Sequence, residues 1–579
     1  MQRYLKYFRV VVSIVMLAAI AFLFLDFSGT LPSAWFRGLT WLQFVPSLIK
    51  FTQTLGHGLA VTAYGFIAVL ILTLLFGRVY CSYICPLGIF QDVATWFSKK
   101  TKKKFRFRFA PPKTRLRYSI LAVTCLSLPV SGIFLINLLD PYSAFGRFAS
   151  DLFRPLYMIA NNLLVKIWQI MGSYALYPVT VTKTDPYALI VPVAMLALVI
   201  WLSVRKGRLY CNAVCPVGTL LGLVSKASLY RIRFDNAECN RCGKCMFACK
   251  SQCIDVKNME VDFSRCVGCG NCLKSCDKNA IRYSLYFTRE NFASLRLCER
   301  SLFRAKSQSR KGKNAQILTV KSMNDEPLKP DISKRNFIAG SALFIAALSG
   351  FSVQAMAQNR RRGNRGNGGN GGNRGNGGNR ENGQGFHHGN HYAVAEHVAT
   401  PPGSRDRQHF TGACTACHLC VSACPTGVLK PSLFEYGFFG MMQPFMDYDA
   451  SFCNHECVRC TEICPNGAIL PLTVEEKLTT QIGVVRFERH NCIVVTEGTS
   501  CGSCSEHCPT KAVRMVPYMG ELTIPETTPD ICVGCGACEY ACPVIPYKAI
   551  VVDGLLQHQL AQRPEEEELE EKPLEEFPF

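Results

Sequence analysis

Long apolar stretches alternate with basic loops in the first part of the chain, and this pattern predicts membrane-spanning helices. Each stretch has close to the roughly 20 residues that an α-helix needs to cross a bilayer. The expected spans are Val10–Leu25, Leu59–Phe76, Ile120–Leu139 and Tyr187–Val204, with a weaker fifth stretch at Phe337–Ala357.

The loop between the second and third stretches fixes the expected orientation. It carries ten Lys and Arg residues between positions 99 and 117, and short loops this basic stay in the cytoplasm. The N-terminus and residues 205–335 are therefore expected inside, with 28–58 and 140–186 outside. Leu156–Met171 is apolar but is interrupted by two Asn and one Lys, which indicates an amphipathic helix on the outer surface.

The fifth stretch resembles a twin-arginine export signal in which lysine replaces the first arginine. It follows Ser333-Lys334-Arg335-Asn336-Phe337 and ends in Ala355-Met356-Ala357. An ordinary membrane anchor with a positive inner flank is the alternative. Either interpretation places the C-terminal half outside, and cleavage after Ala357 stays open.

A Gly/Asn-rich tether at residues 359–390 follows, which cannot bury a core. An RNA-binding arginine–glycine segment is the alternative, but interleaved aromatic residues are lacking. A metal site at His387, His388 and His391 is a weaker hypothesis.

These boundaries divide the chain into seven segments. They are a four-helix transmembrane domain (1–228), a cytoplasmic cysteine-rich domain (229–300), a basic linker (301–333), the signal or anchor (334–357), the tether (358–400), an exported cysteine-rich domain (401–555) and an acidic tail (556–579).

Charge supports this division. The net charge is +22, but residues 1–400 carry 52 Lys/Arg against 18 Asp/Glu, whereas residues 401–579 carry 12 against 24. Such asymmetry is typical of a protein whose halves lie on opposite sides of a membrane. The basic runs flank apolar segments, which disfavours a nucleic-acid partner.

Cysteine is the most informative residue type, because 24 of the 31 cysteines fall into six groups of four. Disulfide frameworks are typical of short secreted chains with irregular spacing, so metal ligation is favoured. Two groups precede the linker, and in a two-cluster ferredoxin three close cysteines hold one cluster while the fourth ligates the other. The expected first cluster uses Cys239, Cys242, Cys245 and Cys276, and the expected second uses Cys266, Cys269, Cys272 and Cys249.

Lys250 and Asp277 replace the proline that usually follows the fourth cysteine, and ligation is expected to survive this change. Cys125, Cys253 and Cys298 stand outside the groups and are interpreted as packing residues.

The C-terminal half repeats the motif four times, each time with proline after the fourth cysteine. The ligands expected there are Cys414, Cys417, Cys420 and Cys424; Cys453, Cys457, Cys460 and Cys464; Cys492, Cys501, Cys504 and Cys508; and Cys532, Cys535, Cys538 and Cys542. How these four groups pair is left open. Cys414–His418 also fits the c-type haem pattern, but a haem would leave Cys420 and Cys424 without a role. Zinc is disfavoured because zinc-ribbon intervals are lacking.

A duplicated segment marks a further candidate site. Residues 77–88 recur at 207–218, and each copy contains Cys-x3-Cys-Pro, with Cys81 and Cys85 in the first and Cys211 and Cys215 in the second. Two such pairs, each at the cytoplasmic end of a membrane helix, are expected to converge as four thiols. A redox-active thiol or metal site, structural packing and a reversible disulfide pair remain the three interpretations.

The expected fold class is a multi-domain membrane protein, in which an α-helical transmembrane bundle is joined to α+β ferredoxin-like [4Fe–4S] domains, a two-cluster one at 229–300 and a four-cluster one at 401–555. Together these features resemble a fusion of two proteins. Residues 1–300 resemble NapH, the membrane polyferredoxin of periplasmic nitrate reductase systems, in the paired Cys-x3-Cys-Pro motifs and the two-cluster ferredoxin that follows. The same features occur in the polyferredoxin of copper-oxidase assembly and in NosR-type proteins. Residues 334–555 resemble NapG, an exported four-cluster ferredoxin.

The resemblance implies a quinol dehydrogenase of the bacterial inner membrane. It would take electrons from membrane quinol and pass them through six [4Fe–4S] clusters to a periplasmic reductase or cytochrome. His57 is a conceivable proton acceptor, although a structural role is the simpler interpretation. The alternatives are a conduit fed by a cytoplasmic ferredoxin, a thiol- or metal-handling assembly factor, and a NosR-type regulator. The regulator is disfavoured because the outside loops are too short to hold the flavin-bearing domain that it would need.

Overall fold

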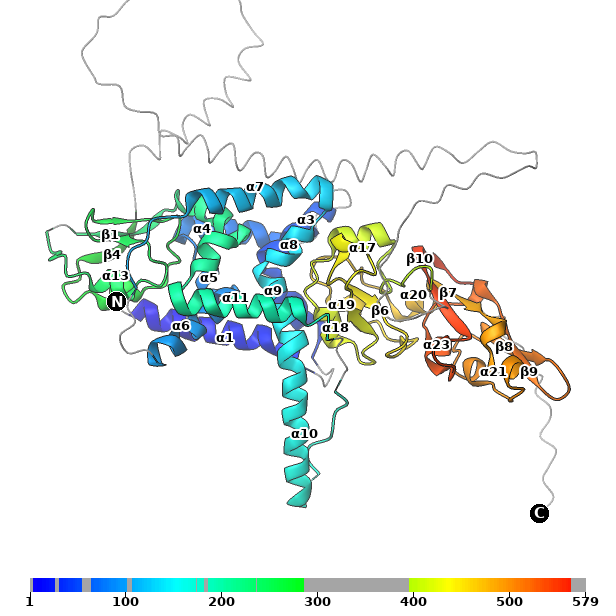
Figure 1. The fold of residues 1–579 in the computed structure, drawn as a ribbon. Helices are drawn as coiled ribbons and strands as arrows, with labels where there is room; N and C mark the ends of the chain where they lie inside the picture. The colour runs from blue at the N-terminus through cyan, green and yellow to red at the C-terminus, as the bar shows by residue number, and fades with distance from the viewer. Residues whose placement is uncertain are drawn as a thin grey trace, which may run out of the picture.

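The structure is a computed structural model that describes residues 4–26, 31–54, 64–101, 107–172, 174–181, 186–235, 237–285 and 395–563. These residues form a helical bundle (residues 4–228), a small unit (230–285) and a large unit (395–563), with the two units at opposite ends of the bundle (Figure 1). The expected fifth stretch, the tether and most of the acidic tail lie outside the described residues, as do His57, Cys298, His387, His388 and His391.

The bundle is built from apolar helices of unequal length, among which α1 and α11 run along the line from the small unit to the large unit (Figure 1). The elements are α1 (Leu5–Leu25), α2 (Ser33–Trp41), α3 (Phe44–Thr54), α4 (Gly65–Phe76), α5 (Tyr80–Tyr83), α6 (Pro86–Thr101), α7 (Thr114–Ser131), α8 (Phe134–Leu139), α9 (Pro141–Arg147), the π-helical turn η3 (Phe148–Phe153), α10 (Arg154–Ile170), α11 (Ile190–Lys206), the π-helical turn η4 (Tyr210–Val214) and α12 (Pro216–Ser225).

These helices differ in part from the expected spans. Within the described residues, α1 is the one helix that is long and apolar enough to cross a membrane. The stretch Ile120–Leu139 was expected as one helix, but it is divided between α7 and α8 at Gly132. The reason is local, because Gly132 has φ +59°, a left-handed conformation in which a right-handed helix cannot continue.

Many apolar side chains of the bundle face outward. On α1, for example, Val11, Ile14 and Phe22 are each more than half exposed, and Val123 and Ile190 are similar on α7 and α11. A soluble helix normally buries its apolar stripe. The bundle therefore presents apolar surface on several helices at once.

The amphipathic helix expected at Leu156–Met171 is α10, which projects from the bundle across the direction of α1 (Figure 1). Leu156, Leu163 and Ile167 on this helix are largely exposed. Its two asparagines do not face apolar surroundings, because Asn162 pairs with both backbone groups of Val179 at 2.8 and 2.9 Å, in the segment that runs back along the helix.

The small unit has two short antiparallel strand pairs and two one-turn helices around a core rich in cysteine. Strand β1 (Tyr230–Phe234) pairs with β4 (Ile281–Leu285), and β2 (Ile254–Asp255) pairs with β3 (Glu260–Val261), while the helices are α13 (Lys244–Ala248) and α14 (Asn271–Ser275). This order, with the outer strands closing the unit, is the α+β ferredoxin-like arrangement expected from the sequence.

The large unit repeats this scheme and extends it. Its helices are α17 (Arg407–Ala413), α18 (Leu419–Ala423), η5 (Phe438–Gly440), α19 (Arg459–Ile463), α20 (Val474–Thr479), η6 (Arg489–Asn491), α21 (Ile493–Thr496), α22 (Ser503–Glu506), η7 (Pro529–Ile531) and α23 (Ala537–Ala541). Its antiparallel strand pairs are β5 (Leu429–Pro431) with β6 (Pro444–Met446), β7 (Thr480–Phe487) with β10 (Ile550–Leu560), and β8 (Val513–Pro517) with β9 (Thr523–Thr527).

The boundary expected at residue 555 is too early. Strand β10 continues to Leu560 because Gln559 and Leu560 still pair with Gln481 and Thr480 of β7. The strand pair β7–β10 bridges the middle of the large unit and its C-terminal end.

Candidate iron–sulfur sites

Four of the six cysteine motifs share one local conformation. In each, a residue with positive φ precedes a one-turn helix that carries the third cysteine, and the fourth cysteine ends that helix in an extended conformation. Gly243, Gly270 and Gly536 occupy the positive-φ position in three of them, where glycine avoids the steric cost that a side chain brings. Because the fourth cysteine is extended, the chain turns away there from the first three cysteines. The fourth thiol therefore lies apart from the site that those three form.

His418 takes that position in the remaining motif, with φ +61°. Its side chain is buried, with Nδ1 2.8 Å from an Asp151 carboxylate oxygen of η3 and Nε2 2.8 Å from the Met442 carbonyl oxygen. Both ring nitrogens are thus engaged, which argues against the haem alternative. The histidine of the motif instead joins the large unit to the bundle.

In the small unit, the cysteines separate into the two expected groups. Cys249, Cys266, Cys269 and Cys272 line one cavity, which is named site 2. Cys239, Cys242 and Cys245 lie together on the other side, where burial and the neighbouring thiols of Cys239 and Cys242 raise the pKa of the Cys245 thiol to about 11. These three define site 1, to which the ferredoxin pattern assigns Cys276 as fourth ligand.

Cys253, interpreted from the sequence as a packing residue, also lines the cavity of site 2. Its Sγ lies 3.5 Å from that of Cys249. The cavity therefore contains five thiols, and no spacing rule identifies the fifth.

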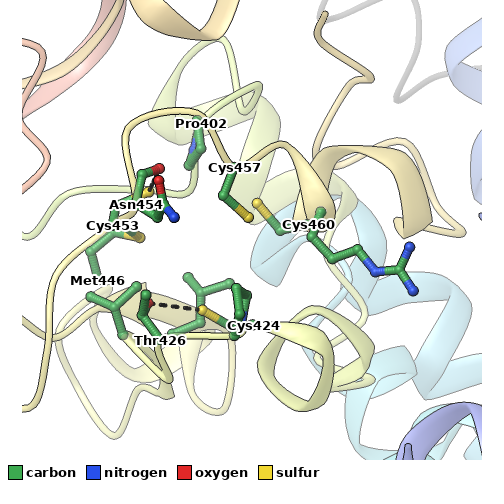
Figure 2. A pocket seen from close by; sticks show the side chains of 12 residues that line it. Pro402, Cys424, Thr426, Met446, Cys453, Asn454, Cys457 and Cys460 are labelled. Atoms are coloured by element: carbon green, nitrogen blue, oxygen red, sulfur yellow. Dashed lines mark hydrogen bonds between the residues drawn. The ribbon is translucent and has the colours of Figure 1, made fainter. Parts of the chain in front are cut away.

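The structure pairs the first two motifs of the large unit with each other. Figure 2 shows the sulfur atoms of Cys424, Cys453, Cys457 and Cys460 around one cavity, so that Cys424 comes from the first motif and the others from the second. This group is site 4. Conversely, burial and the nearby thiols of Cys414, Cys417 and Cys464 raise the pKa of Cys420, which defines site 3 as Cys414, Cys417, Cys420 and Cys464.

The last two motifs exchange their fourth cysteines in the same way. Burial, with the thiols of Cys501 and Cys542, raises the pKa of Cys504 to about 12. Burial, with Cys532 and Cys508, raises the pKa of Cys535 to about 11. Site 5 consists of Cys508, Cys532, Cys535 and Cys538, and site 6 of Cys492, Cys501, Cys504 and Cys542.

These donor sets fit an iron–sulfur cluster. Among the described residues no three His, Cys, Asp or Glu side chains surround a point that a single metal ion would occupy. At sites 4 and 2 the cysteines instead line a cavity between them. Every described cysteine is a free thiol. Four thiolates around a space of this kind are the ligand set of a [4Fe–4S] cluster, which supplies one-electron transfer when bound.

Lys250, which replaces the expected proline after Cys249, connects site 2 to the bundle. Its ammonium lies 3.3 Å from the Asp92 carboxylate of α6, and its carbonyl oxygen accepts a hydrogen bond from the Arg208 amide at 3.1 Å. Asp92 is buried and also pairs with Arg9 and Arg208. Lysine in place of proline at position 250 thus has a structural role, because it links site 2 to α6 of the bundle.

The Cys-x3-Cys-Pro cysteines lie in the bundle between the two units. No helix runs through either pair, because α5 and η4 end before the second cysteine and a new helix starts at the following proline. All four side chains are nonetheless buried, with 2–3% exposure, and the thiols interact electrostatically with one another. This group of Cys81, Cys85, Cys211 and Cys215 is named the bundle site.

Interactions between neighbouring sites arrange them in one row. The Cys245 thiol of site 1 interacts electrostatically with Cys272 of site 2, and Cys420 of site 3 does so with Cys460 of site 4. Sites 4 and 5 meet where the Cys453 amide donates to the Cys535 carbonyl oxygen at 2.9 Å. Sites 5 and 6 are neighbours because each takes its fourth cysteine, Cys508 or Cys542, from the motif that forms the other site.

The bundle site lies next to site 2, because Ser82, beside Cys81, donates to the carbonyl oxygen of Val267, beside Cys266, at 2.7 Å. Towards site 3, Arg147 of α9 donates to the carbonyl oxygen of Ala416, beside Cys417, at 3.2 Å. The spatial order is therefore site 1, site 2, bundle site, site 3, site 4, site 5 and site 6.

The fold and its cysteine sites define an iron–sulfur electron-transfer protein of the ferredoxin type. Models of 4Fe–4S dicluster domains match residues 413–469 and 498–545, so that each covers one of the two motif pairs, although the second begins after Cys492. Models of 4Fe–4S binding domains match residues 259–282 and, in two parts around the bundle site, residues 60–104 and 187–235.

Known proteins agree with this class. The chain is 33% identical over 160 residues to the methylamine utilization ferredoxin-type protein MauM of Paracoccus denitrificans, covering 26% of this chain and 69% of that protein. It is 30% identical over 161 residues to ferredoxin-type protein NapG of Escherichia coli K12 (26% and 68%) and 27% identical over 158 residues to NapF of the same strain (27% and 86%). No solved structure matches.

The chain belongs to the family of ferredoxin-type proteins that includes NapG and MauM. It spans about two thirds of the length of these two relatives.

Proposed function

We propose that this protein is a quinol dehydrogenase of the bacterial inner membrane that resembles NapG and NapH acting together. Membrane quinol would lose two electrons and two protons to become quinone. The electrons would leave singly through the row of sites to a periplasmic reductase or cytochrome. The small unit, with residues 229–333, would lie in the cytoplasm and the large unit in the periplasm.

The observation that carries this proposal is the row itself. Site 2 and site 3 lie on opposite ends of the bundle, and each is fixed to it by buried polar contacts, Lys250 with Asp92 on one end and His418 with Asp151 on the other. The exposed apolar side chains of α1, α7 and α11 support a lipid environment between these ends.

The chain's own residues hold the row in place rather than perform bond chemistry. Buried side chains set the position of each site, and hydrogen bonds to the cysteine sulfurs set its potential. A buried charge acts on these potentials as well. Lys477 is 3% exposed and interacts electrostatically with both Cys453 of site 4 and Cys535 of site 5.

A conduit fed by a soluble cytoplasmic donor is the second candidate, because Cys242 of site 1 is exposed. Electrons from a reduced carrier would then enter at the far end of the same row. This candidate shares the bundle and the large unit with the first and differs only in the donor.

Anaerobic membranes that contain the full-length protein distinguish the two. Addition of quinol should reduce the clusters of the large unit, as measured by electron paramagnetic resonance. The Cys417→Ser/Cys420→Ser variant, which removes two ligands of site 3, should block this reduction beyond the bundle while leaving the small unit reducible. If a reduced cytoplasmic carrier reduces the large unit and quinol never does, the dehydrogenase proposal is wrong.

A further inference from the structure

Three carboxyl groups are buried in the described part of the bundle, and they differ in their partners. Asp92 forms ion pairs with three cations, and Asp151 pairs with His418. Asp140 is the most buried of the three, at 1% exposure, yet none of the ion pairs between described residues includes it. A carboxylate removed from water without a cationic partner is costly unless it takes up a proton. Asp140 is therefore the buried carboxyl group whose protonation is free to change.

Asp140 is held in place by the start of α9, of which it is the N-cap. The Ser143 amide and the Ser143 hydroxyl each donate to Asp140 Oδ2 at 2.8 Å. Burial raises the pKa of this carboxyl group to about 6, against about 3.9 in water, while the bonds from Ser143 and the positive charge of Arg147 limit the rise. Near neutral pH a modest change of the local charge is therefore enough to add or remove its proton.

The bundle site is formed by both copies of the sequence repeat, which hold each other in place. Arg78 donates to the Cys211 carbonyl oxygen at 3.0 Å, and Arg208 donates to the Cys81 carbonyl oxygen at 2.6 Å. The residue that precedes each of these cysteines therefore has an equivalent, fixed position. In both copies this residue is a tyrosine.

These two tyrosines connect the bundle site to Asp140. The Tyr210 hydroxyl donates to the carbonyl oxygen of Leu139, next to Asp140, at 3.1 Å. Tyr80 and Tyr210 both interact electrostatically with the Asp140 carboxyl group. The Cys215 thiol does so as well. Asp140 therefore adjoins the bundle site.

The helix that Asp140 begins also contacts site 3. A Cβ at Gly146 would lie 2.3 Å from the Cys417 carbonyl oxygen, and the Cys417 thiol interacts electrostatically with Asp140. The Tyr142 hydroxyl is buried without a hydrogen-bond partner among the described residues. It interacts electrostatically with Asp140 and with two thiols of site 3. Because a hydroxyl both donates and accepts hydrogen bonds, Tyr142 is suited to pass a proton to Asp140 and from it.

We infer that Asp140 takes up one proton when site 3 gains an electron and releases that proton when the electron leaves. The added negative charge at site 3 favours the protonated carboxyl group, and the neutral carboxyl group in turn favours the added electron. The electron comes from the preceding part of the row and leaves to site 4, while the proton comes from water and returns to it. The O–H bond of the carboxyl group is the one bond that forms and breaks.

The inference requires a cluster at site 3 but not quinol as the electron donor, so it goes beyond the proposed function and does not depend on it. The groups that face Asp140 from the elements packed around it are Ser143, Tyr142 and Arg147 of α9, Tyr80 of α5, Tyr210 of η4, Cys215 and Cys417. Arginine and tyrosine keep their charge between about pH 5 and pH 8, and thiolates bound to iron carry no proton. His418 also faces site 3, and its effect is common to the wild type and to variants of Asp140.

Redox titrations of the purified full-length protein at pH values from 5 to 9 test the inference. The signal of site 3 is the electron paramagnetic resonance signal that the Cys417→Ser/Cys420→Ser variant lacks. In the wild type, the reduction potential of site 3 should become more negative as the pH rises above about 6. The slope should reach up to about 59 mV per pH unit, the one-electron equivalent of a tenfold change in proton concentration. Below that pH the potential should level off, because the carboxyl group is then protonated in both redox states.

Asp140→Asn should remove this pH dependence. Asparagine is neutral at every pH and is an equally favoured N-cap, so the start of α9 is preserved. The potential of site 3 should match that of the wild type at pH 5 and be more positive than it at pH 8. Asp530→Asn, at an exposed carboxyl group of the large unit, serves as control and should keep the wild-type dependence. Equal pH dependence in the wild type and in Asp140→Asn would overturn the inference.

Ser143→Ala keeps the test valid if Asp140→Asn does not fold. It removes one of the two hydrogen bonds to the carboxylate, which raises the pKa of Asp140. The potential of site 3 should then begin to fall at a higher pH than in the wild type. Infrared difference spectra near pH 7 give a second readout, because reduction of the wild type should produce the carbonyl band of a protonated carboxyl group. An unchanged onset in Ser143→Ala, or reduction without this band, would contradict a proton on Asp140.

The same preparations separate this inference from the proposed function. If quinol does not reduce the large unit but the potential of site 3 depends on pH through Asp140, the dehydrogenase proposal fails and the inference stands. If quinol reduces the large unit and the pH dependence is the same with and without the Asp140 carboxyl group, the inference fails and the dehydrogenase proposal stands.

Discussion

The Nδ1 atom of His418 lies 2.8 Å from the carboxylate of Asp151, 267 positions earlier in the chain. Both side chains are buried, at 0% and 3% exposure. His418 adopts a left-handed conformation that glycine occupies in three sister motifs, at a steric cost of about 1 kcal/mol. The contact to Asp151 offsets this cost and fixes site 3 against the bundle.

Asp151→Asn should therefore loosen the large unit from the bundle. Removing one partner of a buried pair costs about 3–5 kcal/mol. Amide hydrogen exchange should increase in α18 and η3, while the exchange of β8 and β9, far from the contact, should not change. Asp277→Asn breaks the exposed pair with Lys244 and serves as control, with an expected effect below about 1 kcal/mol. Unchanged exchange in Asp151→Asn would show that the pair does not hold the interface.

The exchanged fourth cysteines make a sharp prediction for the large unit. Cys424→Ser changes a residue of the first motif, yet it should perturb the cluster whose other ligands belong to the second motif, Cys453, Cys457 and Cys460. Cys464→Ser should perturb the cluster at Cys414, Cys417 and Cys420. Electron paramagnetic resonance of each variant, compared with Cys414→Ser and Cys457→Ser, identifies which signals change together. If Cys424→Ser changes the same electron paramagnetic resonance signals as Cys414→Ser, the pairing is wrong.

Cys253 gives site 2 a reserve ligand. Its Sγ is 3.5 Å from that of Cys249, so Cys249→Ser should retain most of the iron at site 2. Cys249→Ser/Cys253→Ser should lose that cluster, about four iron per chain, whereas Cys253→Ser alone should keep it. Iron and sulfide analysis of the three variants measures this. Complete loss in Cys249→Ser would mean that Cys253 only packs.

His558 makes the stability of the large unit depend on pH. Burial lowers the pKa of this histidine to about 4, and its Nε2 lies 2.7 Å from Thr400 Oγ1. In the unfolded chain the pKa is near 6.5. Between these values the unfolded state binds the extra proton, so the contribution to stability is complete above about pH 6.5 and falls as the pH drops towards 4.

The pKa difference corresponds to up to roughly 3 kcal/mol. His558→Gln should show a shallower loss of unfolding free energy between pH 7 and pH 5 than the wild type, as measured by denaturant titration. His490→Gln, at a largely exposed histidine, should keep the wild-type slope. Equal slopes in all three proteins would contradict a buried neutral His558.

The buried charge of Lys477 should affect two centres at once. Lys477→Met removes a cation that interacts with Cys453 and Cys535, so the reduction potentials of sites 4 and 5 should both become more negative. Site 6 should not change. A potentiometric titration of the variant and the wild type measures the shifts, and Lys511→Met provides a control at an exposed lysine. If the reduction potential of only one of the two sites shifts, the Lys477 ammonium does not act on both sites as the structure indicates.

Cysteine spacing predicted much of the candidate sites, because the ligands of each triad are local in sequence. The two groups of the small unit were expected from the ferredoxin pattern, and the structure brings together the four cysteines expected for site 2 and the three local ones expected for site 1. The pairing in the large unit was left open, since spacing does not show which triad Cys424 or Cys542 approaches. That depends on contacts between motifs, such as the Cys453 amide with the Cys535 carbonyl oxygen.

Other features were beyond the sequence pattern for a related reason. Hydropathy does not show that Gly132 divides one apolar stretch into two helices. Asp151 carries no motif, and His418 stood out only as part of a haem pattern that both of its ring nitrogens contradict. Arg78 and Arg208 did lie within the duplicated segment, so their repetition was a signal that they contribute to the bundle site.

The exchange of fourth cysteines has a consequence for biogenesis. Site 3 needs Cys464 in addition to the triad that ends at Cys420, and site 6 needs Cys542 in addition to the triad that ends at Cys504. A nascent chain that stops between two motifs can complete neither of their clusters. Neither cluster of a pair can therefore be completed before both motifs are present, and an evolutionary gain or loss of a single motif would damage two centres rather than one.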